Sequence, residues 1–119
     1  MDERDERGTQ PIVVCVPGEM PEIRHVPWPM TLEEMQSLVG GYIQIVYSVR
    51  DEYREHILGY ANEEGLLYGL ALNAGASVMA GHAIVGTMFW CGKGDGRGND
   101  TPVPQVMVDH IEQMRRLVG

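Results

Sequence analysis

Four polar residues form the densest group that could bind another molecule: Asn62, Glu63, Glu64 and Asn73. Amide and carboxylate groups near the tip of a turn can orient a small polar ligand or a protein partner. The same residues also have a structural interpretation, because Asn and Glu are common in solvated turns and Gly65 permits a positive φ. We favour turn chemistry for the two glutamates, and both interpretations apply to Asn62 and Asn73.

Acid–base or nucleophilic catalysis finds little support in the spacing of reactive residues. Glu63 and Glu64 are adjacent, so on a strand they would point to opposite faces. The four histidines lack the spacing of known metal motifs. Cys91 and His82 could pair as nucleophile and base, but a thiol among Phe89 and Trp90 is more often packed in a core. We therefore expect no enzyme activity, no metal and no cofactor.

A glycine-rich segment over Gly92–Asp100 invites two functional interpretations. Its glycines, with Lys93 and Arg97, could wrap a phosphate, and its acidic and amide side chains could bind Ca²⁺. Neither Walker A nor GxGxxG spacing is present, and a calcium β-roll needs several repeats. A solvated loop is the favoured interpretation, with Arg97 kept as a candidate ligand-binding residue.

Trp28 lies between Pro27 and Pro29 and is expected in a stiff loop. An exposed tryptophan there could stack on a ligand or anchor a partner. The candidate ligand- or partner-binding residues are therefore Trp28, Asn62, Glu63, Asn73 and Arg97.

The elements that must position these residues are mainly strands. β-branched and apolar runs predict strands bounded by turn residues. They lie at Ile12–Val16, Glu22–Val26, Tyr42–Tyr47, His56–Ala61, Leu66–Leu70 and Ile84–Cys91. The runs on either side of Asn62–Gly65 predict a hairpin, and the small residues of Asn73–Gly81 predict a loop.

Two helices are predicted. Thr31 and Glu34 form a capping box before Leu32–Val39, and Gly40 is placed to end that helix. A second, amphipathic helix is expected over about Val103–Val118, with Thr101 as its cap. Its apolar stripe must pack on the sheet or on a second copy of the chain, and the second alternative would make a homodimer.

Length and charge limit the remaining options. A chain of 119 residues is expected to form one domain. Its net charge of −8 argues against generic nucleic-acid binding, and its apolar runs are too short to span a membrane. The first ten residues are charged and polar, which predicts a disordered lead-in over 1–10, no signal peptide and a cytoplasmic protein.

Several short segments resemble, in order, those of a family of bacteria, phages and plasmids, domain of unknown function 3846 (DUF3846). They are Val16-Pro17-Gly18 with Pro21; Leu32, Glu33 and Met35 leading into Leu38–Ile43; Asn62–Gly65; Gly69–Asn73; and Ile84–Thr87. The resemblance covers roughly residues 12–92 and implies an α+β fold and a mobile-element setting. It implies no activity.

Together these observations predict a single α+β domain over residues 11–119, with a mixed or mainly antiparallel sheet of about five strands and two helices packed on it. We expect a small non-enzymatic binding protein of a phage or plasmid that modulates a host protein. An acidic surface favours a basic partner. The alternative is a protein that binds or sequesters a small nucleotide or signalling ligand.

Overall fold

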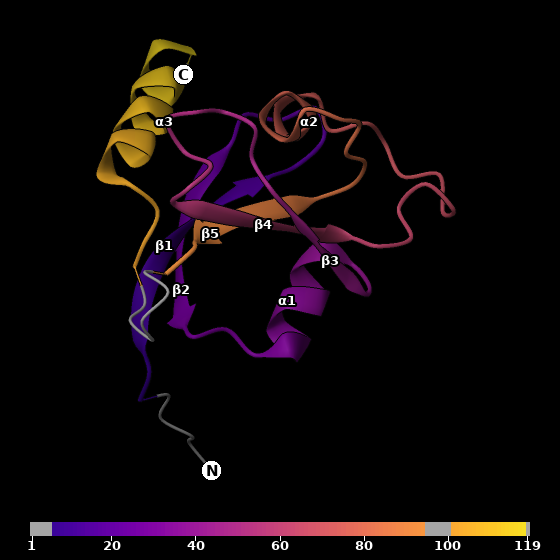
Figure 1. Cartoon of the computed structure of the whole chain (residues 1–119), viewed down its shortest axis with the longest axis horizontal. Coiled ribbons are helices and arrows are strands. Elements are labelled where there is room, and N and C mark those ends of the chain that lie inside the picture. The colour runs from indigo at the N-terminus through magenta and orange to yellow at the C-terminus, as the bar shows by residue number, and fades with distance from the viewer. Residues whose placement is uncertain (1–5, 95–100, 119) are drawn as a thin grey trace.

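One antiparallel sheet of five strands organises the chain (Figure 1). The computed structural model describes residues 6–94 and 101–118. The strands are β1 (Gly8–Cys15), β2 (Glu22–Trp28), β3 (Ile43–Val46), β4 (Ile57–Asn62) and β5 (Met88–Gly92), and the helices are α1 (Leu32–Val39), α2 (Ala74–Ala80) and α3 (Gln105–Val118). The sheet order is β2-β1-β5-β4-β3, with every pairing antiparallel. The predicted α+β class is confirmed.

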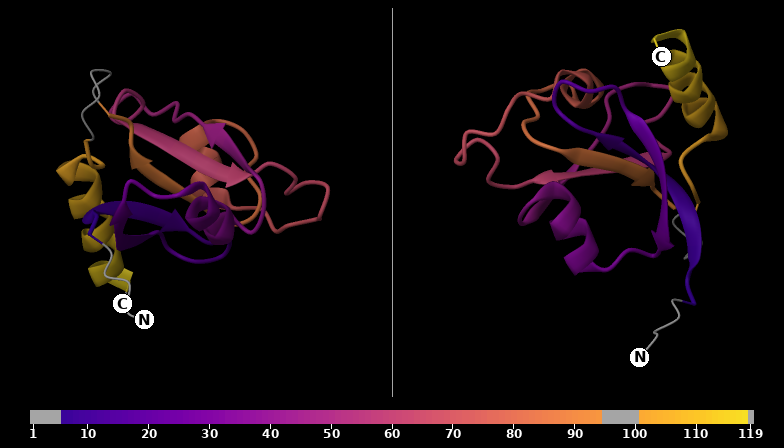
Figure 2. Two further views of the ribbon diagram at one scale, coloured as in Figure 1. Left: turned by 90° about the horizontal axis from the view of Figure 1, so that it is seen from below. Right: turned by 180° about the vertical axis from the view of Figure 1, so that it is seen from behind.

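Helices cover both faces of the sheet, which makes three layers (Figure 2). α1 packs on the face that carries Val14 and Phe89. α2 and α3 pack on the opposite face, which carries Val13 and Trp90. β5 and the second half of β1, from Ile12 to Cys15, are buried on both faces, as expected for an apolar run without alternation.

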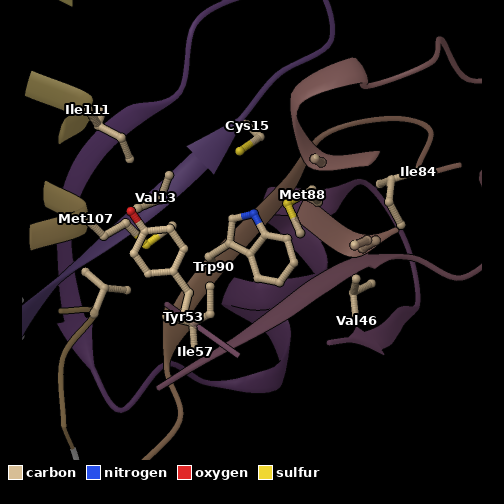
Figure 3. Packing of buried hydrophobic residues seen from close by; sticks show 14 of the residues in the cluster. Val13, Cys15, Val46, Tyr53, Ile57, Ile84, Met88, Trp90, Met107 and Ile111 are labelled. Carbon is tan, nitrogen blue, oxygen red and sulfur yellow. The ribbon is translucent and has the colours of Figure 1, made fainter. Parts of the chain in front are cut away.

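The core beneath α2 and α3 is built around Trp90 (Figure 3). Trp90 pairs with Gly59 across β5 and β4, and a Cβ added at Gly59 would lie 2.8 Å from the Trp90 ring and from the Met88 methyl group. Only a glycine therefore lets the indole lie flat across β4.

The capping box of α1 is present as predicted. Thr31 Oγ1 accepts from Glu34 N at 3.1 Å, and Glu34 Oε1 accepts from Thr31 N at 2.8 Å. Gly40 ends the helix in the left-handed region with φ of 84°. Arg7 adds a bidentate ion pair to Glu34, at 2.8 and 2.9 Å.

The folded part begins earlier than residue 11. β1 starts at Gly8 and pairs with β2 along its length, so the prediction of a disordered lead-in is wrong for residues 8–10. Residues 1–5 lie outside the described part of the chain. Arg7 also belongs to the fold, through its ion pair with Glu34.

Two local predictions between β4 and β5 are wrong. The segment Asn73–Gly81 contains α2 and is not a loop, because Asn73 caps the helix and its small residues can pack against the sheet. Leu66–Leu70 does not pair as a strand; it lies in a turn that follows β4. β4 instead pairs with β3 and β5, so the expected hairpin does not exist.

α3 begins at Gln105, two residues later than predicted. Thr101 does not cap it, because its Oγ1 accepts from Gly94 N at 3.1 Å. Val103 is buried ahead of the helix. In residues 6–94 and 101–118, no helix is both long and apolar enough to cross a membrane.

Candidate functional site

Asn62 ends β4 beside the C-terminus of α1. It is 7% exposed, and its Oδ1 accepts from Glu64 N at 2.8 Å while its Nδ2 donates to Val39 O at 3.3 Å. That leaves one amide hydrogen of Asn62 without an acceptor among the described residues. A Cβ at Gly41 would lie 2.9 Å from Nδ2, so the close turn after α1 depends on a glycine there.

A pocket of about 530 Å³ opens beside Asn62. Its lining comes from five separate parts of the chain: Pro17; Ser37, Leu38, Val39 and Gly40; Asn62; Tyr68, Leu70 and Ala71; and Gly86 and Thr87. We call this the Asn62 pocket. No described residue that lines it is charged, and its polar groups are hydroxyls, an amide and backbone atoms. Such a lining suits an uncharged polar group, such as a peptide carbonyl or a side-chain amide.

The turn that follows β4 forms one wall of this pocket and projects from the body (Figure 1). At its tip three consecutive large side chains face solvent: Leu66, Leu67 and Tyr68 are 80%, 76% and 66% exposed. We call these three residues the apolar tip. A run of such residues exposed together is unusual for a protein surface that stays in water.

The turn is held in shape by backbone hydrogen bonds and by packing. Tyr68 N donates to Glu64 O at 3.1 Å, and Leu70 N donates to Gly65 O at 3.0 Å. A Cβ at Gly65 would lie 2.6 Å from the Val85 side chain, so the base of the turn sits tightly against that residue. The apolar tip is thus presented by an ordered turn, which lowers the entropy that a partner must remove on binding.

The edge strand β3 lies beside the same turn. Glu63 N donates to Tyr42 O at 2.8 Å, which continues the ladder between β4 and β3. The sheet order leaves the other edge of β3 without a partner strand in the described chain. Tyr42, which precedes β3, and Ile45 within it are also exposed, so this part of the chain has exposed apolar side chains of its own.

Asn73 has a structural role. Its Nδ2 donates to Cys15 O and to Gly86 O, both at 2.9 Å, and its Oδ1 accepts from Ala76 N at 3.4 Å. All of its side-chain hydrogen-bonding groups are therefore used inside the fold. It positions Gly86, which lines the Asn62 pocket, without lining that pocket itself.

The other predicted site residues do not meet at this pocket. Trp28 belongs to β2 and packs, half-buried, against the core under α1, which corrects the expectation of an exposed anchor in a loop. Its indole Nε1 is buried without a hydrogen-bond partner. Glu63 is exposed at the start of the turn and does not line the pocket. Arg97 lies outside the described residues.

The two cysteines are free, buried and on opposite faces of the sheet. Cys15 belongs to the core under α2 and α3, and Cys91 to the core under α1. Burial raises the pKa of each thiol to about 12. A thiol with such a pKa stays protonated at neutral pH and is a poor nucleophile. Within the described ranges, no group of three or more His, Cys, Asp or Glu is placed to hold a metal ion.

Comparison with protein families decides the relationship of the chain. The model of the family described as domain of unknown function (DUF3846) matches residues 9–117. The chain belongs to the DUF3846 family. No curated protein and no solved structure matches it.

The DUF3846 match extends past the residues 12–92 over which the short motifs resemble the family. It therefore includes most of β1 and nearly all of α3. In the fold, each of the separate motif segments from Val16 to Thr87 contributes to the Asn62 pocket. The apolar tip is the part that sequence reasoning misinterpreted, because Leu66–Tyr68 resembles a strand in composition and only the fold leaves it uncovered.

Proposed function

We propose that this DUF3846 protein is a non-enzymatic binding module that recognises an extended segment of a basic protein. The apolar tip and the β3 edge contact that segment, and the Asn62 pocket receives one of its uncharged polar groups. The observation that carries the proposal is the exposure of three consecutive large apolar side chains on an ordered turn beside a pocket. Covering such side chains is favourable, at about 25 cal/mol for each Å² of apolar surface.

Strand addition supports an extended partner. β3 offers unpaired backbone groups along one edge, and an extended peptide can pair with such an edge through its own backbone. Side chains on alternate sides of the peptide can then reach the apolar tip and Asn62. The spare amide hydrogen of Asn62 suits a carbonyl oxygen of the partner.

Charge supports a basic partner. Glu63 and Glu64 adjoin the apolar tip, and the whole chain carries a net charge of −8. An acidic face attracts basic segments and raises their rate of association, in a salt-dependent way. A nucleotide fits the Asn62 pocket less well, because no Lys or Arg among the described residues lines it to pair with phosphate.

Selection from a library of displayed random peptides tests the proposal. The wild-type chain is expected to enrich peptides in which apolar residues adjoin Lys or Arg, and salt is expected to weaken their binding. The triple variant Leu66→Ser, Leu67→Ser, Tyr68→Ser is expected to lose that enrichment while keeping its fold, because all three side chains are exposed.

A matched control is available on α3, where Leu117 and Val118 are 79% and 74% exposed. Changing both to Ser removes equally exposed apolar side chains elsewhere, and we expect it to leave the enrichment intact. Equal enrichment by wild type and triple variant, or none by either, would refute the proposal. The proposal would also be refuted if sedimentation equilibrium showed the wild type as a dimer and the triple variant as a monomer, because the tip would then bind a second copy of the chain. A host protein is the partner that this proposal predicts.

A further inference from the structure

A second cavity, of about 460 Å³, lies on the other face of the sheet from the Asn62 pocket. β1 and β5 form its floor, and α2 and α3 form two of its walls, with Trp90 at the centre (Figure 3). We call it the α2–α3 cavity. α3 packs along β2 toward one side of the sheet, away from α2, which leaves this space between the two helices (Figure 1).

Most of the wall is apolar and adaptable. Three methionines line it, Met79 from α2 and Met107 and Met114 from α3, and Ile111 lies among them. Methionine side chains are unbranched and polarizable, so they can adjust to ligands of different shape. The floor is closely packed by contrast, because Trp90 is 1% exposed and its ring would lie 2.8 Å from a Cβ added at Gly59.

The polar groups of the cavity favour an anion. Arg50 is its one charged lining side chain among the described residues, and no Asp or Glu lines it. The Arg50 Nε donates to Glu52 Oε1 at 3.0 Å, and its Nη groups have no partner in the described chain. Tyr53 and His110 also line the cavity and bind each other, with 3.2 Å between Tyr53 Oη and His110 Nδ1.

We propose that the α2–α3 cavity binds a small apolar carboxylate. Its hydrocarbon body lies between Trp90 and the three methionines, and its carboxylate pairs with the Nη groups of Arg50. An aliphatic or aromatic acid with about ten carbons is of the size that cavities of this volume accept. This cavity shares no lining residue with the Asn62 pocket, so the proposal of a bound carboxylate does not depend on the proposed partner binding.

Titration calorimetry and thermal unfolding with sodium decanoate, kept below its micelle concentration, test the proposal. Decanoate is expected to bind saturably and to raise the unfolding temperature, because a ligand that binds only the folded chain stabilises it. 1-Decanol has the same apolar body without the charge and is expected to bind at least about tenfold more weakly.

Two variants locate the bound probe. Arg50→Gln is expected to weaken decanoate binding about tenfold and to leave decanol binding unchanged. Arg54→Gln is the matched control, since Arg54 is a neighbouring exposed arginine outside the cavity lining. Gly75→Leu is expected to block both probes without unfolding the chain, because a Cβ at Gly75 meets nothing within 4 Å and Gly75 lines the cavity.

The proposal is overturned if decanoate shows no saturable binding. It is also overturned if Gly75→Leu leaves decanoate binding intact, which would place the probe elsewhere. Equal binding of decanoate and decanol, or equal losses in the Arg50 and Arg54 variants, would contradict the role of Arg50 and hence the choice of a carboxylate.

Discussion

At the scale of single residues, two asparagines beside two glycines fix the geometry of the candidate site. Asn62 joins β4 to the end of α1, and Asn73 joins β1 to the segment that carries Gly86. Both contacts bridge parts of the chain that are distant in sequence. The sequence shows the residue types, but it does not show which backbone carbonyls their amides reach.

Gly41→Ala tests the contact with Asn62. The new methyl group would lie 2.9 Å from Asn62 Nδ2, so the amide must move and its hydrogen bond to Val39 O is weakened. We expect the free energy of unfolding to fall by about 1–2 kcal/mol. Gly75→Ala is the control, because it adds a methyl group in open space within α2 and is expected to stabilise by about 0.5–1 kcal/mol. Urea denaturation measures both changes, and equal effects of the two variants would contradict the account.

Asn73→Ala removes the amide that donates to two backbone carbonyls, and it also removes the N-cap of α2. Because Asn73 is 3% exposed, the Cys15 and Gly86 carbonyls lose their shared donor in a buried place. We expect a loss of about 2–4 kcal/mol in the free energy of unfolding. Asn73→Asp is expected to destabilise more, because a carboxylate would face two carbonyl oxygens. A change below about 0.5 kcal/mol for Asn73→Ala would show that these bonds contribute little.

At the scale of elements, short sequence patterns predict a helix correctly where the contacts that stabilise it join residues close together in the sequence. Thr31, Glu34 and Gly40 lie within ten residues of one another, and α1 has the predicted bounds. α2 was missed because its stability comes from Ala76 and Ala80 packing under the sheet, while its composition resembles a loop. The apolar run Leu66–Leu70 predicts a strand wrongly, because composition alone does not show whether a neighbouring strand is present to pair with it.

The capping box of α1 predicts a defined pH dependence. Hydrogen bonds from Arg7 and from the Thr31 backbone lower the pKa of Glu34 from its usual 4.5 to about 2. The folded state therefore holds this carboxylate ionised at pH values where the unfolded chain takes up a proton. The stabilisation is complete above pH 4.5 and is lost as pH falls toward about 2.

Glu34→Gln isolates this contribution. Relative to the variant, the wild type is expected to lose stability between pH 4.5 and about 2, and the difference is expected to stay constant at higher pH. Glu33→Gln is the control, because Glu33 takes no part in the capping box. Urea denaturation across this pH range measures the difference. A wild-type advantage that persists unchanged at pH 2 would contradict the ion pair.

At the scale of the whole molecule, net charge opposes association between copies of the chain through their exposed apolar side chains. The chain is acidic, with an isoelectric point near 4.8, and its apolar tip is uncovered. Near the isoelectric point this repulsion vanishes, so we expect light scattering to rise at pH 4.8 relative to pH 7. The triple Ser variant of the apolar tip has the same charge and is expected to scatter less. Equal scattering by both chains would assign the association to another surface.

The candidate site is formed only by the fold of the whole molecule. Segments from residue 17 to residue 87 meet at the Asn62 pocket, and no local pattern brings them together. Asn62 can be predicted as a site residue from its residue type and its place beside a turn. The sequence does not identify Ser37, Thr87 or the uncovered tip as neighbours of Asn62, because that depends on how β4 pairs in the sheet.

We propose that the apolar tip and the Asn62 pocket form one binding surface for an extended basic segment. Amide chemical-shift mapping by NMR, with a peptide selected from the displayed library, tests it most directly. We expect the largest shifts at residues 62–71, at β3, at Gly40 and Gly86, and at the Asn62 side-chain amide. Shifts concentrated on α3 or β2, with the Asn62 amide unchanged, would contradict the account.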